Sequence, residues 1–214
     1  MLSRAELIAA QAIEAVVDVG ANEGLFAKRL RDEGFSGRIL SFEPLSSAFV
    51  LLASASATDP SWECLHLALG ATSGEATLNV AGNLASSSFL AMDSGLPEAD
   101  PRLAYIGKEE CSVSTLDALA PDLFEPKERL YLKLDVQGFE LEVLRGAEAT
   151  LDRVFALDVE LSQTLLYEGA PLMDEVVAYL GDRDYVLLGT EPAYIHPRTG
   201  ETLQVNGLFA RNSR

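Results

Sequence analysis

The sequence is poor in cysteine and has no long apolar run. Its 214 residues include two cysteines without C-x-x-C spacing, which indicates reduced thiols rather than a disulfide framework. No apolar stretch reaches transmembrane length, and polar residues interrupt the first thirteen positions, so neither a membrane span nor a signal peptide is predicted. These features predict a cytoplasmic protein.

Basic residues are also scarce. The chain has 16 Lys and Arg against 33 Asp and Glu, giving a formal net charge of −17. Nucleic-acid binding rests largely on Lys and Arg contacts to phosphate, and the short basic run 28–31 is typical of the exposed face of a helix. We therefore expect no nucleic-acid partner.

The G-x-G-x-x-G pattern of a dinucleotide-binding turn is missing. Instead, the β-branched run 15–19 contains Asp18 and leads into a turn with Gly20, Glu23 and Gly24, after which a helical pattern begins. Two acids would repel a pyrophosphate, whereas they favour the ammonium and sulfonium of S-adenosylmethionine. The pattern thus indicates S-adenosylmethionine over NAD, with an NAD-dependent oxidoreductase as the alternative.

A second acid supports a nucleoside cofactor. The apolar run 38–43 ends at Glu43, directly before Pro44, and Glu43 follows Asp18 by 25 positions. A βαβ unit delivers an acid to a ribose at a spacing of roughly 20. Glu43 is therefore expected to accept hydrogen bonds from ribose hydroxyls.

Strand and helix patterns alternate along the first third of the chain. This order predicts an α/β fold, a parallel sheet with helices on both faces, in a single domain spanning 1–214. Ser3 and Glu6 have the spacing of a capping box in an N-terminal helix within 1–14. The expected strands and helices are 15–19, 24–33, 38–43, 46–57 and 62–68, the last containing His66.

The alternation of strand and helix patterns stops in the middle of the chain. Residues 74–80 alternate like a short strand, but 81–112 is rich in Ala, Ser, Gly and Pro without a clear period, and Cys111 is expected in a loop there. Loops of this length are uncommon unless functional or disordered. We predict that 81–112 is a lid or an insertion, with polar contacts from Asn83 and serines 86–88.

Two later strands also end in acids. Residues 130–134 form a buried strand that contains Lys133 and is followed by Asp135, and the strand 154–160 ends at Glu160. Unpaired buried charges are costly, so Lys133 and Asp135 either serve a site or pair with each other. Because ligands of open parallel sheets bind beyond the carboxyl ends of the strands, four acids are expected in one crevice, namely Asp18, Glu43, Asp135 and Glu160.

These segments together resemble the FkbM-type methyltransferases. The similarity is carried by V-D-V-G-A-N at 17–22, F-E-P at 42–44, L-K-L-D-V-Q-G-F-E at 132–140 and L-R-G-A at 144–147, and it continues through 160–167. The resemblance implies the Rossmann-like class I methyltransferase fold, with a mostly parallel seven-stranded sheet and an antiparallel late strand. It also implies S-adenosylmethionine as donor and a hydroxyl acceptor on a sugar or secondary metabolite.

The resemblance also assigns roles to individual residues. The ribose is assigned to Glu43, and Asp135 takes the position that faces the methyl group. Ala68 and Leu69 are expected against the adenine. The methionyl end is assigned to the turn residues Asp18, Gly20, Ala21, Asn22 and Gly24.

Transfer to a hydroxyl needs a base, because an alcohol is a poor nucleophile at neutral pH. Asp135 or Glu160 is expected in that role, with Lys133 holding the acceptor oxygen or neutralising Asp135. Mg²⁺ bound by the two acids is an alternative that we rank second, so no metal site is predicted. His196 in a predicted hairpin is a less favoured base.

The expected partner is a small-molecule or glycan acceptor, with Tyr167 and Glu168 as candidate contacts. A catalytically silent Rossmann-like binding module is the alternative from another class of protein. The pattern indicates no particular oligomeric state.

Overall fold

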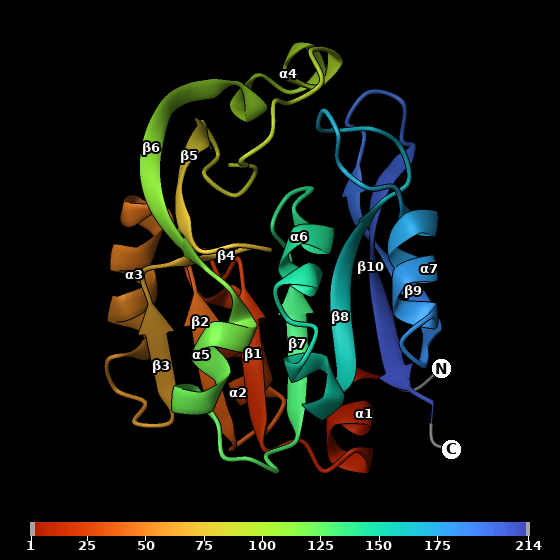
Figure 1. The fold of residues 1–214 in the computed structure, drawn as a ribbon. Helices are drawn as coiled ribbons and strands as arrows, with labels where there is room; N and C mark the ends of the chain where they lie inside the picture. The colour runs from red at the N-terminus through yellow and green to blue at the C-terminus, as the bar shows by residue number, and fades with distance from the viewer. Residues whose placement is uncertain (1–2, 213–214) are drawn as a thin grey trace.

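The computed structural model describes residues 3–212 and arranges them around a seven-stranded sheet (Figure 1). Neighbouring strands are parallel from β3 to β8, whereas β10 runs antiparallel to both β8 and β9. The fold class expected from the sequence is thereby confirmed. In sheet order the strands are β3 (Trp62–Leu65), β2 (Arg38–Phe42), β1 (Ala15–Val19), β7 (Leu130–Leu134), β8 (Val154–Ser162), β10 (Thr202–Arg211) and β9 (Tyr185–Ile195).

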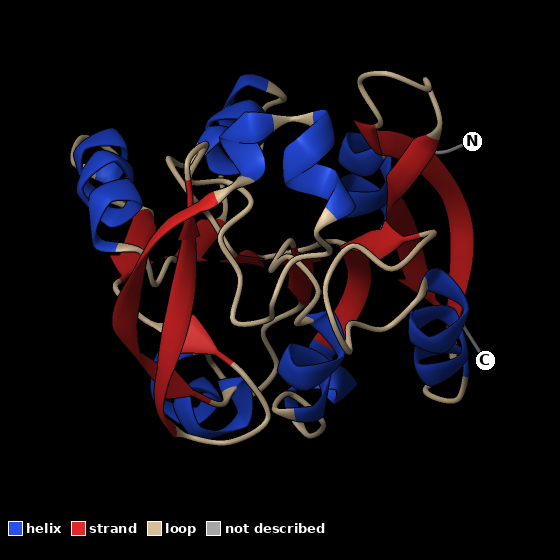
Figure 2. Cartoon of the chain, turned by 90° about the horizontal axis from the view of Figure 1, so that it is seen from above, coloured by secondary structure: helices blue, strands red, loops and turns tan. Residues whose placement is uncertain are grey.

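Helices cover both faces of this sheet (Figure 2). One face carries α1 (Arg4–Ala10), α2 (Leu25–Asp32) and α3 (Ser46–Ser56). The other carries α5 (Leu116–Leu123), α6 (Glu140–Arg145) and α7 (Met173–Gly181). Two 3-10 turns, η1 (Pro101–Leu103) and η2 (Thr150–Arg153), complete the helical segments.

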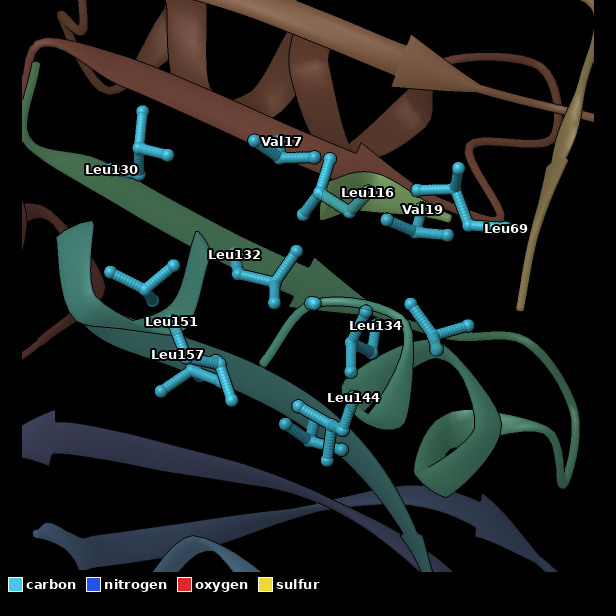
Figure 3. Close-up of a cluster of buried hydrophobic side chains, with 14 of the residues drawn as sticks. Val17, Val19, Leu69, Leu116, Leu130, Leu132, Leu134, Leu144, Leu151 and Leu157 are labelled. Atoms are coloured by element: carbon cyan, nitrogen blue, oxygen red, sulfur yellow. The ribbon is translucent and has the colours of Figure 1, made fainter. Parts of the chain in front are cut away.

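The two central strands, β1 and β7, are mostly apolar because both of their faces are covered, and the charged exceptions are Asp18 in β1 and Lys133 in β7. All five residues of β1 are buried. Val17 and Val19 pack in the larger core with Leu116 of α5 and Leu144 of α6 (Figure 3), whereas Val16 packs on the α2 side. A rigid pair of central strands therefore supports the turns that follow β1 and β7.

A second sheet of three strands stands beyond the carboxyl ends of the central strands (Figure 1). It consists of β4 (Ala68–Leu69), β6 (Tyr105–Ser114) and β5 (Gly74–Ala81). The short helix α4 (Gly95–Ala99) belongs to the same upper part.

The predicted strand 62–68 is wrong in its second half. β3 ends at Leu65, and Ala68 already belongs to the small sheet. The chain bends at His66, whose ring stacks on Phe49 with 4.7 Å between centroids and whose Nε2 lies 2.9 Å from the Pro44 carbonyl. These local contacts interrupt the strand, and the apolar pattern does not report them.

The segment 81–112 is more regular than its composition indicates. It contains α4, η1 and most of β6, so the prediction of a loop around Cys111 is wrong. Cys111 is buried in β6, opposite Ala76 of β5. The sequence gives little indication of β6, because its partner strand lies about thirty residues earlier and its exposed positions mix apolar, small and charged residues.

The predicted N-terminal helix is real but shorter than 1–14. The capping box is confirmed, since the Ser3 hydroxyl accepts from the Glu6 amide and the Glu6 carboxylate accepts from the Ser3 amide. The helix ends before Ala12, whose φ is 48°. Residues 1–2 lie outside the described residues. Within 3–212, no helix is long and apolar enough to cross a membrane.

Candidate active site

The turn after β1, residues 20–24, is called the first turn here. Gly20 has φ +73°, and a Cβ there would lie 1.9 Å from the carbonyl oxygen of Asp135. Gly20 and Ala21 both donate backbone hydrogen bonds of 3.0 Å to the Phe42 carbonyl. The first turn is thus pressed between the ends of β2 and β7, and only glycine fits position 20.

Glu43 holds the first turn from the end of β2. Its Oε2 accepts from the backbone amide of Asn22 at 2.7 Å, and its Oε1 accepts from the amide of Leu45 at 2.8 Å. Burial raises the pKa of Glu43, partly offset by these two hydrogen bonds. An ionised carboxylate has about four acceptor sites, so Glu43 keeps capacity for a ligand hydroxyl.

Asp18 does not reach the crevice in which the sequence analysis placed it. Its side chain is fully buried on the α2 side of the sheet, where it accepts from Ser41 Oγ at 3.2 Å. Lys133 of the neighbouring strand lies 3.1 Å from Asp18 Oδ1 and 3.7 Å from Asp135 Oδ2. Asp18 therefore acts on the site through Lys133.

Lys133 connects the two strand ends. Its Nζ donates to the carbonyl oxygen of Gly20 at 2.9 Å. Burial alone lowers the pKa of Lys133, but the carboxylates of Asp18 and Asp135 outweigh burial and hold that pKa above its usual value. Lys133 is thus a fixed cation beneath the first turn, and of its two expected roles the structure supports neutralisation of Asp135.

The turn after β7, residues 135–139, is called the second turn. Gln137 has φ 54° and Gly138 has φ +95°, which is a demanding backbone conformation for two successive residues. Glu140 stabilises it, because its Oε1 accepts from the amides of Val136 at 3.1 Å and Gly138 at 3.2 Å. Burial raises the pKa of Glu140 to about 7, although the backbone hydrogen bonds oppose this rise.

Gln137 joins three polar side chains by hydrogen bonds, namely those of Asp135, Glu160 and Tyr167. Its Nε2 donates to Asp135 Oδ1 at 2.8 Å and to Glu160 Oε2 at 2.6 Å, and its Oε1 accepts from the Tyr167 hydroxyl at 2.6 Å. Burial first, then the charges of Asp135 and Glu140, hold the pKa of Glu160 well above its usual range. Gln204 also donates to Glu160 Oε2, at 2.8 Å.

A cavity of about 650 Å³, the first cavity, opens between the two turns. Glu43 lies among its lining residues, as does Asp135 of the second turn. Its apolar walls include Leu69, Leu78, Phe89 and Phe139.

The segment expected to be a lid contributes to this cavity. Leu84, Ala85, Ser87 and Phe89 line it. The serines chiefly fix the segment itself: Ser87 Oγ donates to the Leu84 carbonyl at 2.7 Å, and Ser88 Oγ donates to the Gln137 carbonyl at 2.7 Å. The segment is thus attached to the second turn, while movement of a lid stays a prediction.

The structure brings together most, but not all, of the predicted site residues. The first cavity is lined by Gly20, Asn22, Glu43, Ala68, Leu69 and Asp135, whereas Glu160 lines a neighbouring cavity that also contacts Asp135. Four predicted residues lie behind these walls: Asp18 and Ala21 are buried, Gly24 precedes α2 against Trp62, and Lys133 is beneath the first turn.

Sequence reasoning missed the roles of Gln137, Glu140 and Phe139. Phe139 lines the first cavity. The sequence signal for Gln137 was its place between Asp135 and Gly138, in the turn after a buried strand. The structure gives Gln137 a positive φ, which is uncommon for residues other than glycine. His196 Nδ1 accepts hydrogen bonds from two backbone amides of its own hairpin, and His196 lines neither cavity.

Within residues 3–212, no group of three or more His, Cys, Asp and Glu side chains is arranged to hold a metal ion. The carboxylates of Asp135 and Glu160 instead both accept from the single amide of Gln137.

Comparison with known structures supports the fold class. At 13% identity and a TM-score of 0.52, the fold matches an rRNA methylase from Streptococcus thermophilus, covering 100% of this chain and 99% of that one. TehB from Haemophilus influenzae gives a TM-score of 0.52 at 9% identity, covering 99% of this chain and 63% of TehB. The architecture is therefore that of the class I methyltransferases.

Sequence comparison gives the family. The model of the methyltransferase FkbM domain matches residues 18–187, so the chain belongs to the FkbM methyltransferase family. Methyltransferase sdnD from Sordaria araneosa is 27% identical over 155 residues, which cover 62% of this chain and 60% of that protein. The family implies S-adenosylmethionine as the methyl donor.

Proposed function

We propose that this chain is an S-adenosylmethionine-dependent O-methyltransferase acting on a hydroxyl of a sugar or secondary metabolite. The observation that carries the proposal is the first cavity, which has a buried acceptor, Glu43, among its lining residues and the carboxylate of Asp135 from the second turn. A small-molecule hydroxyl rather than a nucleic acid is favoured by the net charge of −17. A cytoplasmic location stays a prediction.

The residues of the first cavity fit the donor. Glu43 can accept from ribose hydroxyls, and the apolar side chains of Leu69, Phe89 and Phe139 offer surfaces for the adenine. Gly20 and Asn22 of the first turn are proposed to hold the methionyl end. Asp18 acts through Lys133 and the first turn rather than by contact.

When bound, S-adenosylmethionine supplies an electrophilic methyl group on a positively charged sulfur. The chain must hold the acceptor hydroxyl in line and take its proton. Asp135 lines both cavities and is proposed to orient the hydroxyl, while Glu160 is proposed to accept the proton. The raised pKa of Glu160 makes it a stronger base than an ordinary carboxylate once it is ionised.

Two amides keep this carboxylate in place. Gln137 and Gln204 both donate to Glu160 Oε2, so the proton acceptor has a fixed orientation. We rank a metal-free route ahead of Mg²⁺ because Gln137 already bridges Asp135 and Glu160. Turnover that persists in EDTA supports this ranking, and turnover that needs added Mg²⁺ contradicts it.

Calorimetric titration with S-adenosylhomocysteine and with NAD tests the proposal. We expect one S-adenosylhomocysteine per chain and no NAD binding, because the two acids that line the first cavity, Glu43 and Asp135, disfavour a pyrophosphate. Binding of NAD alone would favour the oxidoreductase alternative. Binding of neither would favour a silent module.

A further inference from the structure

A second cavity of about 610 Å³ adjoins the first. Ala85, Asp135 and Gln137 line both cavities, so the two spaces meet at the second turn. A molecule in the second cavity would therefore lie beside the carboxylate that the proposed function places at the reaction centre.

The walls of the second cavity differ in character. Met92, Leu96, Leu103 and Leu166 form an apolar wall. The polar lining residues are Asp135, Gln137, Glu160, Gln204 and the two tyrosines 167 and 194, whose rings also pack against the apolar wall. A ligand that satisfies both sets of residues is amphipathic, with an apolar body and a hydroxylated end.

One polar atom of this lining has no partner. The hydroxyl of Tyr194 is buried, and no residue within 3–212 forms a hydrogen bond with it. Buried polar atoms are nearly always paired with protein or a bound molecule.

The charge of the cavity also selects its ligand. Among the described residues that line it there is no Lys, Arg or His, whereas Asp135 and Glu160 are both present. The nearby cation Lys133 lies against Asp18 and Asp135 and is not among the lining residues. An anionic ligand would therefore find no cation in the lining, and burying an unpaired charge there would be costly.

We propose that the second cavity binds the methyl acceptor and that this acceptor is an uncharged, amphipathic alcohol. Its hydroxyl lies at Asp135 and Glu160, and its apolar body lies against Met92 and Leu96 of the 81–112 segment. This inference rests on the proposed function, and it adds the location and chemical class of the acceptor.

Three matched probes test it by calorimetry on protein saturated with S-adenosylhomocysteine, below their micelle concentrations. We expect n-octyl β-D-glucoside to bind about tenfold or more tightly than n-octyl β-D-glucuronide, which adds a charge, and than methyl β-D-glucoside, which lacks the apolar chain. Equal or tighter binding of either comparison compound overturns the proposal. Failure of all three to bind overturns it too.

A cavity-filling variant locates the binding. Ala193 is exposed and lines only the second cavity, so Ala193→Trp should reduce octyl glucoside binding by about tenfold or more while S-adenosylhomocysteine binds as before. Thr190→Trp, on the same strand but outside this cavity, is the control and should change neither. Unchanged octyl glucoside binding in Ala193→Trp overturns the location. Loss of S-adenosylhomocysteine binding by the wild-type chain would instead be a failure of the proposed function.

Discussion

The first and second turns follow neighbouring strands of one sheet. Each turn is held by a buried glutamate that accepts hydrogen bonds from backbone amides. Glu43 accepts from Asn22 in the first turn, and Glu140 accepts from Val136 and Gly138 in the second. Both turns contain a non-glycine residue with positive φ, at 48° for Asn22 and 54° for Gln137. In both turns, a buried glutamate thus stabilises an unfavourable backbone conformation.

The two turns differ in what they present. The first turn offers small residues and backbone, and its supporting Glu43 also lines the first cavity. The second turn offers the side chains of Asp135 and Gln137, while its supporting Glu140 is buried and lines neither cavity. We therefore propose that the first turn binds the cofactor and that the second turn carries the chemistry.

The largest expected effect tests this division at the second turn. Asp135→Asn keeps the shape of the side chain and its acceptor for Gln137 but removes the charge. We expect methyl transfer to fall by about 10²–10⁴-fold, since the hydroxyl loses its proposed orienting carboxylate. The rate is measured with labelled methyl donor and the acceptor that wild-type protein uses best. Unchanged turnover would remove Asp135 from the reaction.

Lys133 lies beneath both turns and should matter to the stability of both. Lys133→Met leaves Asp18 buried without its cation, and we expect the free energy of unfolding to fall by about 3 kcal/mol. Adding Asp18→Asn removes the unpaired charge and should restore a large part of that loss. Urea denaturation of both single variants and the double variant measures the coupling. Additive losses would show that the pair does not interact as described.

Contact between the turns should forbid a side chain at position 20. In Gly20→Ala, the new Cβ would meet the Asp135 carbonyl at 1.9 Å and the backbone has φ +73°, so we expect a loss of about 3 kcal/mol. Gly34→Ala is the matched control, because Gly34 has φ +93° but no neighbour within 4 Å. Gly34→Ala should lower the free energy of unfolding by only about 1 kcal/mol. Equal losses in urea denaturation would mean that backbone strain alone matters.

Glu140 should make the second turn sensitive to pH. Its pKa rises from 4.5 to about 7 on folding, so the folded state keeps a proton that the unfolded state releases in that range. The contribution of Glu140 to stability therefore falls as pH rises from 4.5 to 7. Glu140→Gln keeps an acceptor oxygen for both amides and cannot ionise.

We expect Glu140→Gln to equal wild type in unfolding free energy near pH 4.5 and to exceed it by about 2 kcal/mol at pH 8. Urea denaturation at the two pH values measures this difference. A constant difference between the proteins would contradict the burial effect on Glu140.

The sequence predicted the strands that support the site better than the directions and hydrogen bonds of its side chains. The strands 15–19 and 130–134 were correct because a strand covered on both faces is a mostly apolar run, here with one charged residue in each strand. The direction of Asp18 was wrong because one-residue alternation, together with the partner Lys133, turns it toward the helices. Glu140 and Gln137 were missed because their roles depend on backbone amides and on Glu160 from another strand.

One titration tests the division of labour between the turns most directly. S-adenosylhomocysteine is titrated calorimetrically into Asp135→Asn and Glu43→Gln, each compared with wild type. We predict a dissociation constant within about threefold of wild type for Asp135→Asn and a loss of about tenfold or more for Glu43→Gln, which removes a charged acceptor from the cofactor cavity. Equal losses in both variants, or full affinity in Glu43→Gln, would contradict the account.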